Sequence, residues 1–325
     1  MFGYFTDNIT TALTASLAGL VILYIPNTND IFKMMMKMFL CSFGMILSCL
    51  FGLMFSFDIW IATIGFTIFS GIVHYVSKYF RLKPPASFFF IMIAAMMIGQ
   101  PFNLEKIPTK LGIFAIGTII ATSVSILYCV LINPKHKNIG TKSFFKVNPY
   151  INIVESIIIG SCMGVSILVG KLFHLDYPFW IPISSLAVLQ GVNKVHIWKR
   201  GFRRIIGTFA GLLIAWAIFS FFRNPLTVCI IIICLQIIIE LLITRHYALT
   251  VVFLTPMGML LAETGSPTSL DPDHLLKMRL IQILIGSAIG SIGGWFLYNE
   301  KLRFNTVKNL RKSRIALRRR FSKNY

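Results

Sequence analysis

Apolar runs of about membrane-spanning length follow one another along nearly the whole chain, separated by short segments rich in Lys and Arg. The hydrocarbon core of a bilayer is about 30 Å thick, so a helix needs about 20 apolar residues to cross it. Only 13% of the residues are charged and 56% are hydrophobic, which leaves too little polar surface to cover a soluble globule. The sequence therefore predicts an all-α polytopic membrane protein.

The apolar runs predict about eleven transmembrane helices. The seventh run is short, so a re-entrant segment is an alternative to a full crossing. The expected segments are 9–25, 33–55, 58–77, 85–101, 107–132, 152–173, 177–192, 202–222, 224–243, 246–262 and 275–298.

The basic residues predict the orientation of these segments, because cytoplasmic loops near membrane helices are enriched in Lys and Arg. With the N-terminus periplasmic and the C-terminus cytoplasmic, 25 of the 31 basic residues face the cytoplasm. The net charge of +20 then meets anionic headgroups of the lipid bilayer, and nucleic acid is not expected as a partner. The basic residues left outside are Lys106, Lys110, Lys171, Arg223, Lys277 and Arg279.

A weak internal similarity divides the chain into two parallel repeats. The segments that begin at Lys83 and at Arg245 each lead through one apolar helix and a polar loop to a helix with a Gly-Thr or Gly-Ser pair. The expected organisation is a first transmembrane repeat at 1–132, a basic cytoplasmic linker at 133–150, an extra helix plus the second transmembrane repeat at 151–299, and a basic cytoplasmic tail at 300–325.

Four expected helices carry a cation seven residues before a glycine, which places both on one helical face. The cations are Lys37, Lys110, Arg204 and Arg279. A cation in the first turn of a helix opposes the helix dipole, and an arriving anion makes the same position favourable. Two interpretations stay open: the cations anchor lipid phosphates, or they line a substrate path, which applies more to the two arginines than to the lysines.

Small residues recur on the same helices. In lipid, glycines four residues apart mainly allow helices to approach closely. The sequence therefore predicts a helix-packing role for Gly207, Gly211, Gly286, Gly290 and Gly294.

A proton-driven transporter needs a titratable group within the membrane. The candidates for proton coupling are Glu240, Glu155 and Asp58. Pairing of Glu240 with the nearby Arg245 is an equally good interpretation, and for the other two carboxylates an interfacial role is favoured. His74, His174 and His246 lie near segment ends, and nothing in the sequence distinguishes them.

Four motifs then occur in order: Tyr177-Pro-Phe-Trp180, Arg204-Ile-Ile-Gly-Thr-Phe-Ala-Gly211, Arg245-His-Tyr-Ala-Leu-Thr-Val-Val-Phe, and Arg279 leading to Gly286-Ser-Ala-Ile-Gly290. Together they resemble the fusaric acid resistance family of membrane proteins, which includes aromatic acid exporters and is distantly similar to plant aluminium-activated malate channels. The resemblance covers most of the chain and is strongest from about residue 150 onward.

The resemblance implies a multi-pass protein of the bacterial inner membrane that exports organic anions, often with a periplasmic adaptor protein. The leading hypothesis is a secondary exporter of aromatic or other amphipathic organic anions. A passive organic-anion channel and a non-transporting scaffold for envelope assembly are the alternatives, and a homo-oligomer is compatible with each. The expected substrate-binding residues are Arg204, Arg279, Lys37, Lys110, Arg245 and Trp180.

Catalysis is not expected from the sequence. It contains no phosphate-binding loop, no zinc-protease motif and no nucleophile elbow, and its six cysteines form no Cys-x-x-Cys pair. We therefore expect no enzymatic activity, no bound metal and no cofactor.

Overall fold

The computed structural model describes residues 15, 17–25, 31–80, 82, 85–132, 149–191, 194–221, 225–243, 247–263, 272–299, 306 and 308. Every regular element in these residues is a helix, which confirms the predicted all-α class. Six of the described helices are long and apolar enough to cross a membrane, and four apolar helices are shorter. The chain is therefore a multi-pass membrane protein.

The helices follow one another in the order that the apolar runs predict. The first half contains η1 (Gly19–Tyr24), α3 (Ile31–Met54), α4 (Ile59–Tyr79), α5 (Phe88–Ile98), η2 (Leu104–Lys106) and α6 (Ile107–Ile132). The second half contains α7 (Pro149–Leu172), α8 (Trp180–Leu189), α9 (Lys194–Phe221), α10 (Pro225–Ile243), α11 (Tyr247–Glu263) and α12 (Pro272–Leu297).

Two of the eleven expected crossings are helices too short to cross alone. At 1.5 Å per residue, the 11 residues of α5 and the 10 residues of α8 each extend about half the thickness of the hydrocarbon core. Prolines shorten both runs, because Pro85 precedes α5 and Pro178 precedes α8. In each connecting turn a non-glycine residue adopts a left-handed backbone, with φ of 47° at Ala86 and 53° at Tyr177.

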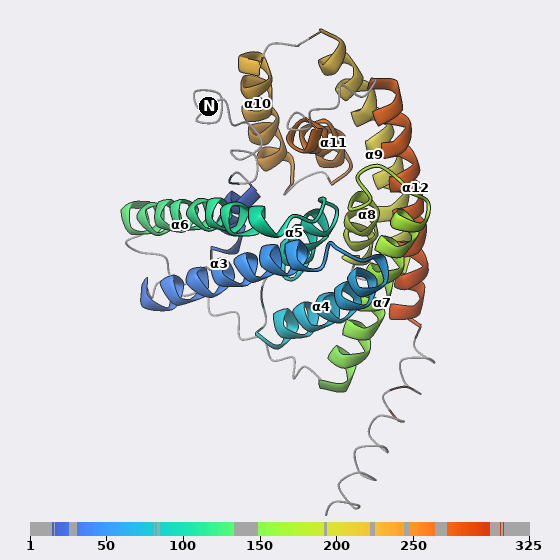
Figure 1. Cartoon of the computed structure of the whole chain (residues 1–325), viewed down its shortest axis with the longest axis horizontal. Helices are drawn as coiled ribbons and strands as arrows, with labels where there is room; N and C mark the ends of the chain where they lie inside the picture. Colours follow the sequence, from blue (N-terminus) through green and yellow to red (C-terminus); the bar gives the residue numbers. More distant parts are fainter. Residues whose placement is uncertain are drawn as a thin grey trace, which may run out of the picture.

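The packing partners of the two halves correspond. In the first half α3 packs against α5 and α6, and in the second α9 packs against α11 and α12. Likewise η1 contacts α6 and α3, as α8 contacts α12 and α9. This correspondence supports the parallel repeat, which stays a prediction. The extra helix α7 packs against α4, α8 and α12, and Figure 1 shows it running beside α12.

Glycines lie where these partners approach most closely. A Cβ atom added to Gly211 would lie 2.5 Å from the carbonyl oxygen of Val252 in α11, and one added to Gly290 would lie 2.6 Å from that of Ser185 in α8. In the first half, a Cβ on Gly52 would lie 2.6 Å from the carbonyl oxygen of Ala94 in α5. Any side chain here would push the helices apart, which fits the packing role expected for Gly211 and Gly290. Gly207 is buried in α9, and Gly294 packs on Ile197.

Candidate functional site

The short helix α8 is enclosed by the protein. All ten of its residues are buried, and it packs against α5, α7, α9 and α12. Figure 1 places it between the horizontal first-half helices and the long helices α9 and α12. Because α8 is shielded from bulk solvent, an unpaired polar group on it is costly and favours a partner within the protein or in a bound molecule.

A buried arginine lies at the N-terminal end of α8. The Cζ atom of Arg279, from α12, lies 3.1 Å from the centroid of the Trp180 ring, and only 5% of the arginine is exposed. A guanidinium over an indole face is a cation–π contact, which is stronger when both groups are removed from water. The pair holds a positive charge where α8 begins.

A second buried arginine lies one turn further along α8. Arg204, from α9, is 6% exposed, and its Nε donates a hydrogen bond of 3.3 Å to the Oγ of Ser184. Within the described ranges no carboxylate forms an ion pair with Arg204. Burial of a charge without an opposite charge is costly, so this position favours the arrival of an anion.

Three further polar atoms near these arginines are buried and have no hydrogen-bond partner among the residues that the structure describes. They are Trp180 Nε1, Ser185 Oγ and Ser287 Oγ. An indole N–H is a donor, and a hydroxyl can donate or accept. We use the name α8 seam for Trp180, Ser184 and Ser185 with Arg204 and Arg279. Ser287 follows Gly286, which packs against Ser184.

The backbone at the start of α8 contributes little to anion binding. The N–H of Trp180 donates a hydrogen bond of 3.2 Å to the carbonyl oxygen of Tyr177, and the N–H of Ile181 donates one of the same length to that of Pro178. Pro182 has no N–H. The donors at the usual anion site of a helix N-terminus are thus already used. The chemistry of the α8 seam comes from its side chains.

The two arginines lie deeper in their helices than the sequence indicates. α9 begins at Lys194 and α12 at Pro272, so neither Arg204 nor Arg279 is in a first turn. The expected opposition to the helix dipole is therefore wrong for both, because that effect fades beyond the first turn. The basic residues before Arg204 extend α9, since Lys and Arg are good helix formers.

Two of the other expected substrate-binding residues, Lys37 and Lys110, lie on first-half helices, α3 and α6. Lys37 is exposed on α3. The Nζ of Lys110 donates to the Oε1 of Gln100, after α5. Arg245 lies outside the described residues.

The candidates for proton coupling have different surroundings. Asp58 caps α4, since its Oδ1 accepts the N–H groups of Trp60 and Ile61 at 2.8 Å. Glu155 forms an ion pair with Lys78, with 3.3 Å between Oε2 and Nζ. Glu240 belongs to α10, and its side chain lies outside the described residues.

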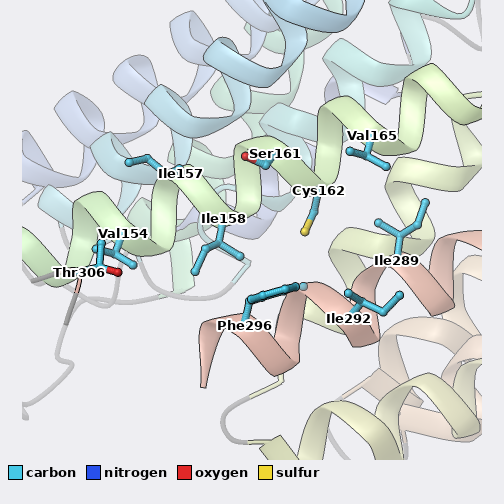
Figure 2. Close-up of a pocket in the computed structure, with 11 residues that line it drawn as sticks. Val154, Ile157, Ile158, Ser161, Cys162, Val165, Ile289, Ile292, Phe296 and Thr306 are labelled. Atoms are coloured by element: carbon cyan, nitrogen blue, oxygen red, sulfur yellow. The ribbon is translucent and has the colours of Figure 1, made fainter. Parts of the chain in front are cut away.

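A separate hollow lies between α7 and α12, and Figure 2 shows the side chains that line it. Its volume is about 520 Å³, and its walls are mainly aliphatic, with Ile157, Ile158, Ile289 and Ile292 among them. Ser161 and Cys162 provide a few polar atoms in this lining. This chemistry suits a hydrocarbon chain rather than an anion, so the α8 seam is the better candidate site.

Sequence reasoning had not singled out Ser184 and Ser185. The available signal was a pair of hydroxyls inside an otherwise apolar run, Trp180 to Leu189. In lipid such residues face other helices or a polar cavity.

With this geometry in place, the similarity to known proteins can be located on the structure. Residues 165–293 match the fusaric acid resistance protein-like family. This match contains every residue of the α8 seam and confirms the resemblance from the motifs. Helices α8 to α11 lie wholly within it.

Two curated proteins that are similar to this chain have names that state no activity. The chain is 32% identical over 149 residues to the uncharacterized membrane protein YvaC of Bacillus subtilis, covering 45% of this chain and 23% of YvaC. It is 28% identical over 148 residues to the uncharacterized protein slr1298 of Synechocystis, covering 45% and 19%. The chain thus spans less than a quarter of either relative. No solved structure matches it.

Proposed function

We propose that this protein is a secondary exporter of aromatic or other amphipathic organic anions in the bacterial inner membrane, and that the α8 seam binds the anion. The observation that carries the proposal is the convergence of Arg204 and Arg279 on one buried helix. The family match over the same residues supports a transport role rather than catalysis.

The seam combines the two properties that an amphipathic acid requires. Arg204 supplies a buried positive charge for a carboxylate, since a guanidinium matches carboxylate geometry. Phe179 and Trp180 supply aromatic surface beside it, with ring centroids 5.2 Å apart. A small inorganic anion would use only the charge, so the aromatic walls favour an organic acid.

Export also requires coupling and a path out of the cell. We propose proton antiport with alternating access between the two halves, an orientation with the N-terminus in the periplasm and the C-terminus in the cytoplasm, and a periplasmic adaptor as a partner. Lipid headgroups would meet the basic cytoplasmic segments. These parts of the proposal follow from the pattern of charges and from the family resemblance.

Flux through purified protein in liposomes tests the function. The vesicles carry an imposed pH gradient, and the assay records the accumulation of aromatic carboxylates together with internal pH. Accumulation with matching proton movement is the expected result. Downhill flux alone would favour the passive channel, and no flux across the panel, with correctly inserted protein, would contradict transport and favour the envelope scaffold.

A variant at the site ties any flux to the seam. Arg204→Gln removes the charge and keeps hydrogen-bonding groups, while Arg203→Gln makes the same change at an exposed neighbour. Flux that falls with the first variant and stays with the second would assign the transported anion to the α8 seam.

A further inference from the structure

His74, on α4, is a buried titratable residue that the α8 seam does not use. It is 8% exposed, and its Nδ1 lies 3.0 Å from the Oγ of Ser87, the residue that precedes α5. Its Nε2 is buried and has no hydrogen-bond partner within the described part of the chain. The sequence did not distinguish this histidine from His174, which the structure shows to be exposed.

The arrangement around the ring accommodates either tautomer of the neutral imidazole. A neutral imidazole has one donor and one acceptor nitrogen, and a serine hydroxyl can donate or accept, so Ser87 can pair with Nδ1 in either tautomer. When Nδ1 donates to Ser87, Nε2 presents an unused lone pair. Leaving a buried polar atom without a partner costs about 1–3 kcal/mol, so the unpaired Nε2 lowers the stability of the fold.

The charged groups nearest to His74 are engaged with each other. Lys78 lies one turn further on α4 and pairs with Glu155 of α7, which packs against α4. The other helix that packs against α4, α5, carries no titratable side chain. The phenol of Tyr24, from η1, donates a hydrogen bond of 2.6 Å to the carbonyl oxygen of Ala86, so its hydroxyl already has a partner.

A short turn connects His74 to α8. Pro85, Ala86 and Ser87 lead into α5, and Ala86 has the left-handed φ of 47° that a non-glycine residue holds only under constraint. The Nε2 of Gln190, the residue after α8, donates a long hydrogen bond of 3.5 Å to the carbonyl oxygen of Pro85. α5 and α8 also pack directly. A change in the His74–Ser87 contact thus has a route to the helix that carries the seam.

We propose that His74 binds the coupling proton, and that the turn Pro85–Ser87 links its protonation to α8. The inference rests on the proposed export function and names its coupling residue. During each cycle His74 takes up a proton from the outer side and releases it to the cytoplasm, while the anion moves outward.

The test uses the full-length protein in liposomes with two assays. Proton-driven accumulation requires coupling, whereas exchange of labelled for unlabelled anion at equal pH requires only the binding site. For His74→Asn, which retains a hydrogen-bonding group near the position of Nδ1, we expect accumulation to fall by about tenfold, a common size of coupling between sites, with exchange retained.

His174→Asn is the matched control, because it makes the same change at an exposed histidine. The backbone there has a φ of 48°, which asparagine tolerates. It should leave both activities unchanged. Accumulation that survives His74→Asn would overturn the inference and leave the export function standing. Wild-type protein without any flux would instead overturn the export function itself, and the inference with it.

A binding measurement covers the case in which His74→Asn fails to fold. Ser87→Ala leaves the imidazole in place and removes only its partner, so the variant should bind the aromatic carboxylate while its proton exchange on binding, read with a pH dye in weak buffer, shifts to a different pH range. A proton exchange with the wild-type pH dependence in Ser87→Ala would contradict the inference.

Discussion

The guanidinium of Arg279 lies over the ring of Trp180, with Cζ 3.1 Å from the ring centroid. Arg279 comes from α12 and Trp180 from the first residue of α8, so this contact ties two helices of the second half together. It also places an aromatic face and a cation at one buried point. Substitutions on either side of the contact therefore test both the fold and the proposed anion site.

Replacement of Trp180 by leucine should weaken both stability and the binding of an aromatic carboxylate. A desolvated cation–π contact contributes about 2 kcal/mol to stability. Loss of the ring contact with the carboxylate, worth about 0.5–1.5 kcal/mol, should lower the affinity by up to about tenfold. Trp180→Phe should retain part of the contact. Titration of the purified protein with the carboxylate measures the affinity. Trp60→Leu, at an exposed tryptophan on α4, is the control, and an equal loss there would argue against a role for the Trp180 face.

Arg204→Gln should reduce the affinity for the transported anion without preventing membrane insertion. The lost charge-assisted hydrogen bond is worth about 1.5–3 kcal/mol, which corresponds to an affinity loss of about tenfold or more. Concentration-dependent flux in liposomes measures the effect. Arg203→Gln, one residue away and exposed, should transport normally. If Arg204→Gln is inserted and transports at the wild-type rate, Arg204 does not lie on the substrate path.

Gly290→Ala should destabilise the packing of α12 against α8. The new Cβ would lie 2.6 Å from the carbonyl oxygen of Ser185, and backbone cannot move aside cheaply. We expect a cost of about 1–3 kcal/mol, seen as a lower melting temperature in detergent. At Gly112, on α6, no atom lies within 4 Å of an added Cβ, so Gly112→Ala should leave stability unchanged or raise it. Equal melting temperatures for the two variants would contradict the close packing.

Two substitutions at Asp58 separate helix capping from proton coupling. Asparagine caps a helix about as well as aspartate, so Asp58→Asn should keep the stability of α4, whereas Asp58→Ala should cost about 1 kcal/mol. Thermal unfolding measures this difference. If Asp58 only caps α4, proton-driven accumulation should survive Asp58→Asn, which has no titratable group. A selective loss of accumulation in this variant would show that Asp58 takes part in proton coupling.

The class of the protein could be predicted from the sequence because the bilayer imposes a strong local rule. A helix is the only single segment whose backbone N–H and C=O groups can all form hydrogen bonds within the segment in lipid. The length of each apolar run therefore indicates where a helix lies. The order of the helices and the family resemblance follow from such local signals. Length also misleads, since the run 177–192 contains only the 10-residue helix α8.

The candidate site was predicted only in part. Arg204, Arg279 and Trp180 stood out through their motifs. Lys37, Lys110 and Asp58 looked comparable, yet in the structure Lys37 is exposed, Lys110 pairs with Gln100 and Asp58 caps α4. Ser184 showed only as one of two hydroxyls in an apolar run, and nothing in the sequence distinguished His74 from the other histidines near segment ends. Whether a serine or a histidine matters depends on which groups lie opposite it, and these come from helices far away in sequence.

The sequence by itself determined that this chain enters the membrane as a set of helices, because the transfer of apolar segments into lipid depends on each segment's own composition. Only the tertiary structure decided that α8 is enclosed, that two arginines meet on it and that one nitrogen of His74 is left without a described partner. Burial and pairing are properties of the packed helices together. A low dielectric gives charged and polar groups their strength only where that packing excludes water.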